Sequence, residues 1–168
     1  MKKLNSKGIK VLKIFHIFFA FSWVISAIVL CLLIFAVHPL SGDEFYMHSR
    51  IVQIVDDYFI IPGAIGALIT GLIYSIWTNW GFFKHPWITV KWVLIIVQIL
   101  LGTFMLSDIV NNNVILADQL RDAALTNPAV LDNILPSKIW GSIQTFFLLF
   151  VVVISVIKPW KKKVKMSA

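Results

Sequence analysis

Four long apolar segments decide what this 168-residue chain can fold into. They run from about Ile14 to Val37, Tyr58 to Trp77, Ile88 to Leu106 and Ile139 to Ile157. A helix needs roughly 20 apolar residues to cross the hydrocarbon core of a bilayer. Only 14% of the residues are charged, whereas about a quarter are charged in an average soluble domain. We therefore expect an all-α membrane protein, a four-helix bundle forming a single domain over residues 1–168.

The positions of the lysines predict the orientation of this bundle. Eleven of them precede the first segment, lie in the turn between the second and third, or follow the fourth; they are Lys2, Lys3, Lys7, Lys10, Lys13, Lys84, Lys158, Lys161, Lys162, Lys163 and Lys165. The positive-inside rule places this side in the cytoplasm, so both termini are expected there. The basic ends then act as topology signals and contacts for anionic lipids, and we expect no nucleic-acid partner. The first segment is too long for a signal peptide, so we expect a retained helix.

The second connection on the outer side, from about 108 to 137, is the only sizeable piece expected outside the membrane. "VILADQLRDAAL" has apolar residues near helical spacing. "NPAVLDNIL" begins with Asn127, a good N-cap, followed by Pro128 at the first helical position. We expect two short helices here, lying over the outer face of the bundle.

Small residues form one face of the second segment. Gly63, Ala67 and Gly71 recur every four residues, with Gly66 and Thr70 beside them. Such a face lets another helix, or a flat ligand, approach closely; close helix packing is the simpler interpretation. Nearby, Pro62 is expected to kink the helix or open it locally near its outer end.

His16 is the only histidine inside a predicted span, and ionisable groups in spans are candidates for functional sites. It lies about one turn inside the cytoplasmic end of the first span, and Trp23 follows on the same helical face. A neutral imidazole is a good axial ligand for haem iron. The alternative is an interfacial histidine that hydrogen bonds to a backbone carbonyl or a lipid headgroup.

Lys91 and His85 lie at nearly the same depth as His16. Lys91 either extends its ammonium group to the lipid headgroups or pairs with an anionic ligand such as a haem propionate. His85 lies in the turn before the third span. It is either a second metal ligand opposite His16 or one member of the aromatic belt formed by the nearby tryptophans.

Further candidates lie toward the outer side. His38 and His48 flank the connection between the first two spans and form a possible second ligand pair. Asp56 and Asp57 precede the second span. They either form a site for a cation or proton, or simply favour the positive end of the helix dipole.

Motifs of soluble enzymes are absent from the sequence: it has no H-E-x-x-H pair, nucleophile motif or phosphate loop. The single cysteine, Cys31, excludes a disulfide framework and a cysteine-based zinc site within one chain.

Three stretches resemble one family. "KIFHIFFAFSW" is similar to the K-x-x-H followed seven residues later by Trp that opens the first helix of HemJ-type protoporphyrinogen oxidases and their CopD-like relatives. "IPGAIGALITGLIYS" resembles their helix with Pro and Gly, and "WITVKWVLIIVQIL" resembles their W-x-x-V-K helix start. The resemblance covers about residues 13–105. The first helix ends in "LLIFAVHPL" rather than the oxidases' R-L-F-V-Y-H type, and the 108–137 connection has no counterpart. The chain is thus closer to the uncharacterised small bacterial membrane proteins of this superfamily.

The resemblance implies haem b in a four-helix bundle of the bacterial cytoplasmic membrane, with His16 as the iron ligand and Lys91 as the matching cation. We therefore expect a small b-type haem protein in electron transfer or in tetrapyrrole or quinone redox chemistry, with a haem-dependent oxidoreductase as one possibility. The alternative is a cofactor-free accessory or transport subunit that packs against a membrane partner or a second copy of itself.

Overall fold

The computed structural model describes residues 3–160, and this part of the chain is all helical, without strands. Four helical stretches are each long and apolar enough to span a membrane, which confirms the expected fold class. Large side chains such as Ile14, Phe18 and Phe21 are more than half exposed on the outside of the bundle. The chain is therefore a multi-pass membrane protein, and these side chains contact lipid.

Two of the four stretches are interrupted by short π-helical segments. The first stretch is α1 (Ser6–Ala36). The second comprises α2 (Gly42–Val55), the π-helical η1 (Asp56–Ile60) and α3 (Ile61–Trp77). The third comprises α4 (Pro86–Leu101), the π-helical η2 (Gly102–Leu106), α5 (Ser107–Leu120) and the 3-10 helix η3 (Arg121–Thr126). The fourth is α6 (Pro128–Ile157).

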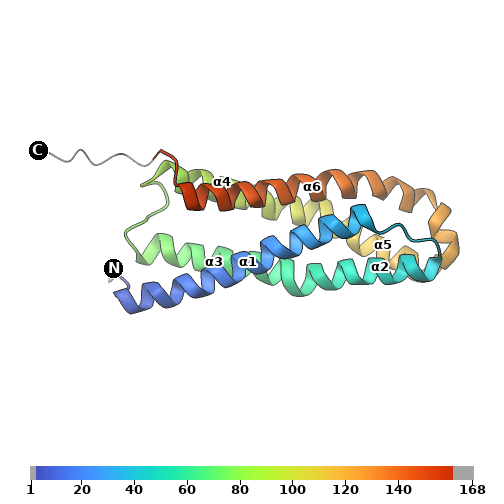
Figure 1. The fold of residues 1–168 in the computed structure, drawn as a ribbon, viewed down its shortest axis with the longest axis horizontal. Helices are drawn as coiled ribbons and strands as arrows, with labels where there is room; N and C mark the ends of the chain where they lie inside the picture. The colour runs from blue at the N-terminus through green and yellow to red at the C-terminus, as the bar shows by residue number, and fades with distance from the viewer. Residues whose placement is uncertain (1–2, 161–168) are drawn as a thin grey trace, which may run out of the picture.

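Both ends of the described chain lie at one end of the bundle. In Figure 1 the start of α1, the end of α6 and the α3–α4 turn are all at the left end of the bundle, and α2 and α5 form the opposite end. This arrangement is the one expected for four crossings with both termini on the same side. We call the end that carries α2 and α5 the outer end, following the lysine distribution.

The helices continue beyond the predicted spans at the outer end. The stretch Gly42–Trp77 contains 36 residues, which is about 54 Å at 1.5 Å per residue, against a hydrocarbon core of about 30 Å. The expected helices of the 108–137 region are present, but they do not lie across the bundle. Instead α5 prolongs α4 and packs along α2, and Pro128 begins α6 itself. The predicted cap is confirmed, because the Asn127 side chain accepts a hydrogen bond from the Ala129 amide at 2.9 Å.

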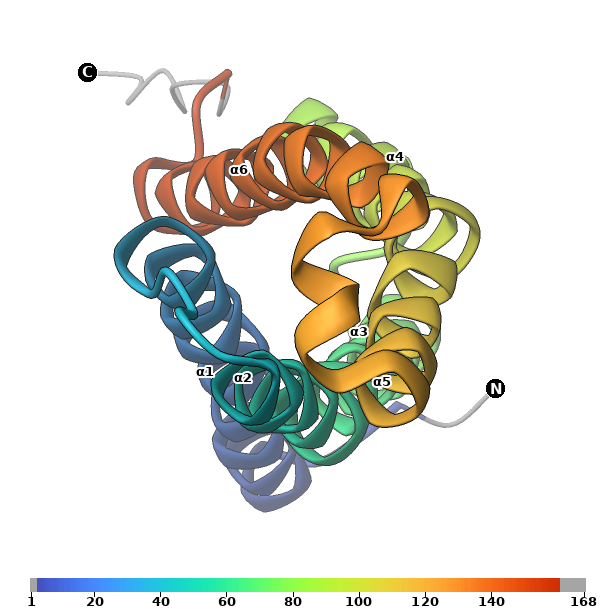
Figure 2. The same cartoon turned by 90° about the vertical axis from the view of Figure 1, so that its right-hand side faces the viewer.

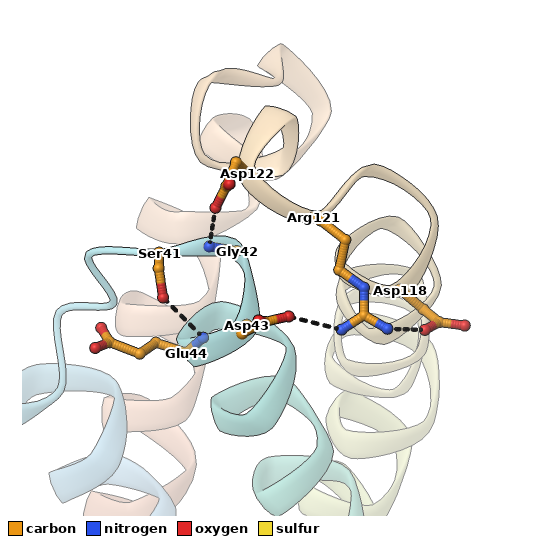
Figure 3. Close-up of polar contacts among 7 residues, drawn as sticks. All are labelled: Ser41, Gly42, Asp43, Glu44, Asp118, Arg121 and Asp122. Atoms are coloured by element: carbon orange, nitrogen blue, oxygen red, sulfur yellow. Dashed lines mark hydrogen bonds and ion pairs between the residues drawn. The ribbon is translucent and has the colours of Figure 1, made fainter.

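A polar clasp joins α2 to η3 at the outer end (Figure 3). The Gly42 amide donates to the Asp122 carboxylate at 2.5 Å, and Arg121 bridges Asp43 at 3.3 Å and Asp118 at 2.8 Å. A Cβ atom on Gly42 would lie 2.2 Å from main-chain atoms of Arg121 and Asp122. The two backbones therefore meet so closely that only glycine fits.

The small-residue face of α3 packs against α1. A Cβ atom on Gly63 would lie 2.8 Å from the main-chain nitrogen of Trp23, and one on Gly66 would lie 2.3 Å from the Phe19 ring. These two glycines therefore serve helix packing rather than a flat ligand. The same close approach sets the rotation of α3 relative to α1 and so decides which α3 side chains face His16.

The side of the bundle between α3 and the α4–η2 stretch is less tightly closed than the others; we call it the loosely closed side. Viewed along the bundle (Figure 2), the helices form a ring in which α1 and α3 adjoin, as do α6 and α4. Close backbone packing joins α1 to α3, α1 to α6, α4 to α6 and α2 to α5, but it does not join α3 to α4 or η2. Side chains of the core, including Ala67 and Ile95, bridge α3 and α4 near the middle.

Candidate functional site

His16 is held in one orientation by a hydrogen-bonded threonine. Its Nδ1 lies 2.7 Å from the Thr70 hydroxyl oxygen. That hydroxyl donates to the main chain of α3, with the Gly66 carbonyl oxygen at 2.6 Å and the Ala67 carbonyl oxygen at 3.1 Å. Because the threonine hydrogen is directed to these carbonyls, we assign the imidazole hydrogen to Nδ1, which donates to the threonine oxygen. The lone pair of Nε2 then remains free, and no described residue forms a hydrogen bond with this atom.

Aromatic side chains enclose the His16 imidazole from α3 and α4. The Tyr74 ring meets it edge-on, with 5.7 Å between ring centroids. A Cβ atom on Gly71 would lie 3.8 Å from both the His16 and the Trp92 rings. Trp92 is fixed in turn, because its indole nitrogen donates to the Ser75 hydroxyl at 3.2 Å. His16 therefore faces Gly71, where α3 lies opposite α4 on the loosely closed side of the bundle.

Lys91 lies on α4 directly before Trp92, whose ring faces the same Gly71 position as the His16 ring. Its side chain is half-buried on α4, and no carboxylate pairs with it within residues 3–160. An ammonium group inside a bundle is costly unless an anion or a polar group compensates it. The structure thus places His16 and Lys91 in the same part of the bundle. His16 offers an imidazole with a free nitrogen, and Lys91 offers a cation without a carboxylate partner among the described residues.

His85 lies in a different environment from His16. Its ring packs against Trp80, with centroids 5.7 Å apart, and stacks on Trp87 at 6.3 Å. Lys158 covers both tryptophans. No described contact joins His85 to His16, and within residues 3–160 no three His, Cys, Asp or Glu side chains gather as a metal site. The second-ligand role of His85 stays a prediction.

The two outer histidines line one cavity of about 340 Å³. His38 is exposed, whereas His48 is half-buried on α2, and its buried Nε2 has no hydrogen-bond partner among the described residues. Asn113 and Lys138 also line this cavity, together with many apolar side chains. The structure therefore brings the predicted outer pair together within the extension of the bundle.

The predicted acidic pair, Asp56 and Asp57, begins the π-helical segment η1. Asp56 lines a second, central cavity of about 400 Å³, whereas Asp57 is exposed. Pro62 is the second residue of α3, just after this segment, and its missing N–H is consistent with the expected local opening of the helix. The central cavity is mainly apolar, with Trp23, Gln98 and Gln144 among its polar contributors.

Sequence reasoning missed several members of these sites. Thr70 is noticeable in the sequence only as a small residue, and Gln144 only as a polar residue in a span. A polar residue facing the interior of a predicted span was the available signal for both. Which residues share a face with His16 depends on helix rotation, which hydropathy does not encode.

Comparison with known proteins adds no family assignment: no family model, curated protein or solved structure matches this chain.

Proposed function

We propose that this chain is a small b-type haem-binding protein of the bacterial cytoplasmic membrane, working in electron transfer or in tetrapyrrole or quinone redox chemistry. The observation that carries the proposal is the His16–Thr70 hydrogen bond of 2.7 Å, which leaves Nε2 as a free ligand atom. Histidines that bind metals usually donate their other ring N–H to a neighbouring acceptor, which fixes the tautomer in this way.

The chemistry of the donor set fits haem b. His16 would supply an axial nitrogen, and Lys91 would supply a cation for a propionate. Haem b, when bound, supplies one-electron redox chemistry. The protein's own part is to orient the imidazole through Thr70, to offer a positive charge beside it, and to keep water away with Tyr74 and Trp92.

Spectroscopy of the purified protein tests the proposal. Protein from haem-replete cells should show a Soret band and b-type maxima on reduction, with haem and protein in a constant ratio. The His16→Ala variant should lose this spectrum, whereas His38→Ala, which changes an exposed histidine at the outer end, should keep it. Colourless, metal-free wild-type protein from such cells would refute haem binding.

One observation favours a second function, that of a cofactor-free accessory or transport subunit. The outer end holds the 340 Å³ cavity lined by His38, His48 and Lys138, well away from His16. A solute or a segment of a membrane partner that binds there would need no haem. Colourless protein that co-purifies with a defined membrane partner would support this second function.

A further inference from the structure

We infer that the central cavity binds the head group of a lipid-soluble quinone or quinol, which enters sideways from the bilayer between α3 and η2. The inference deepens the proposed function by choosing quinone among its possible redox partners and giving it a binding site, and it rests on that function only for electron transfer between quinone and haem. Binding itself is a separate property that can be measured without haem.

The cavity has the size and lining of a small-molecule site. Its volume is about 400 Å³, within the range of roughly 300–1,000 Å³ found for ligand pockets. Most of its wall consists of aliphatic side chains, chiefly from α1 and α3. A few polar groups lie among them, which is the usual composition of a site for an uncharged organic ring.

The cavity reaches the lipid-facing surface on the loosely closed side of the bundle. Ile61 and Ile65 of α3 line the cavity and are 43% and 52% exposed. Thr103 of η2, across the gap, lines it as well and is also exposed. Because close backbone packing does not join α3 to η2, a molecule dissolved in the bilayer can reach the cavity between them.

Two buried polar atoms of the lining residues lack partners. Trp23 is 3% exposed, and its indole N–H donates to no atom of residues 3–160; Gln144 is 7% exposed, and its Oε1 accepts from none of them. An unsatisfied polar atom in an apolar interior costs about 1–3 kcal/mol, so a ligand that pairs with either atom gains affinity. Gln98 differs, because its amide can bridge the main chain of α6 at Gln144 and Leu148.

A quinone matches this pattern of groups. The carbonyl oxygens of a quinone can accept a hydrogen bond from the Trp23 N–H. The hydroxyls of the quinol can donate a hydrogen bond to Gln144 Oε1. The planar ring suits the aliphatic walls, and an isoprenoid tail can leave through the opening beside Ile61 and Ile65. Asp56, which also lines the cavity, is a carboxylate that can accept a hydrogen bond from a hydroxyl of the bound quinol.

Equilibrium binding of a short-chain benzoquinone, and of its quinol kept under reducing conditions, to the full-length protein in detergent tests the inference. We expect saturable binding of one molecule per chain to the wild type. Gln144→Leu should weaken binding of the quinol at least tenfold; it removes an unsatisfied oxygen, so the fold is expected to tolerate it. Ala64→Phe, which fills the cavity, should abolish binding, whereas Ile69→Phe, on a lipid-facing position of the same helix, should leave it unchanged.

The remaining outcomes separate this inference from the haem proposal. Equal binding to the wild type, Gln144→Leu and Ala64→Phe would overturn the site. An absence of saturable binding to the wild type would overturn it too. Equally tight binding of an alkylbenzene without carbonyls would show that the polar groups do not recognise the ligand, and would also overturn it. If His16→Ala loses haem and still binds quinone, the two sites are independent, as we expect. If the wild type is colourless and binds quinone in this manner, the haem proposal fails and the quinone site stands.

Discussion

At the scale of single residues, the chemistry of His16 is decided by Thr70. A threonine in a helix usually donates its hydroxyl to the carbonyl four residues before it, and Thr70 does so to Gly66 at 2.6 Å. Its oxygen is then an acceptor of fixed position. Because that acceptor faces Nδ1, the imidazole presents Nε2 to any ligand, and Thr70 acts as a positioning residue.

Replacing Thr70 with valine should therefore weaken haem retention without removing the ligand. Loss of such a supporting hydrogen bond typically lowers metal affinity by about 10- to 100-fold. Titration of haem into apoprotein, followed at the Soret band, measures the change. Thr89→Val, which removes a hydroxyl bonded to the Phe82 carbonyl, is the matched control. An unchanged haem affinity in Thr70→Val would show that the hydrogen bond does not position His16.

The sequence identified His16 and Lys91 as candidates because each is ionisable within an apolar run. It did not identify Thr70, which is 54 positions from His16. That contact depends on how α3 is rotated against α1, and Gly63 and Gly66 set this rotation. His85, at the same predicted depth as His16, packs within the tryptophan cluster instead. Depth in the membrane is readable from hydropathy, but position around the bundle is not.

At the scale of helices, the contact between α1 and α3 depends on Gly63. Replacing it with alanine should lower the midpoint of thermal unfolding in detergent, because the added methyl group meets the main chain of Trp23 at 2.8 Å. Overpacking of this kind costs about 1–3 kcal/mol. Gly141→Ala is the control, since its Cβ would lie 3.8 Å from Ile34, an ordinary contact. Equal midpoints for both variants would contradict close packing here.

The clasp at the outer end yields a second prediction for helix contacts. Gly42→Ala should destabilise the packing of α2 on η3, because its Cβ would meet the Arg121–Asp122 backbone at 2.2 Å. Asp43→Asn removes only the exposed ion pair with Arg121. Exposed ion pairs contribute about 0–1 kcal/mol to stability, so this variant should have little effect. Amide hydrogen exchange in α2 measures the difference. Faster exchange in both variants alike would show that the ion pair, rather than the close approach, holds the clasp.

Predicted and observed helices differ mainly at the outer end. Hydropathy located the four apolar segments but placed the start of the second at Tyr58, whereas the helical stretch begins at Gly42. A fall in hydropathy marks where lipid contact ends, not where a helix ends. The polar residues of α2 and α5 continue the helices because the two pack along each other.

At the scale of the whole molecule, the orientation in the membrane stays a prediction that labelling can test. In a Cys31→Ser background, a cysteine at exposed Asp132 should react with a membrane-impermeant maleimide on intact cells. A cysteine at exposed Lys84, in the α3–α4 turn, should react only after the membrane is permeabilised. The reverse pattern would place His16 and Lys91 on the outer side.

Rescue by imidazole tests most directly the claim that His16 supplies the ligand nitrogen. The His16→Gly variant removes the side chain and leaves space beside Thr70 for free imidazole. We predict that this variant is purified without a Soret band and regains a b-type spectrum when haem and imidazole are added together, but not with haem alone. A His16→Gly protein that retains wild-type haem content and spectrum without imidazole would contradict the account.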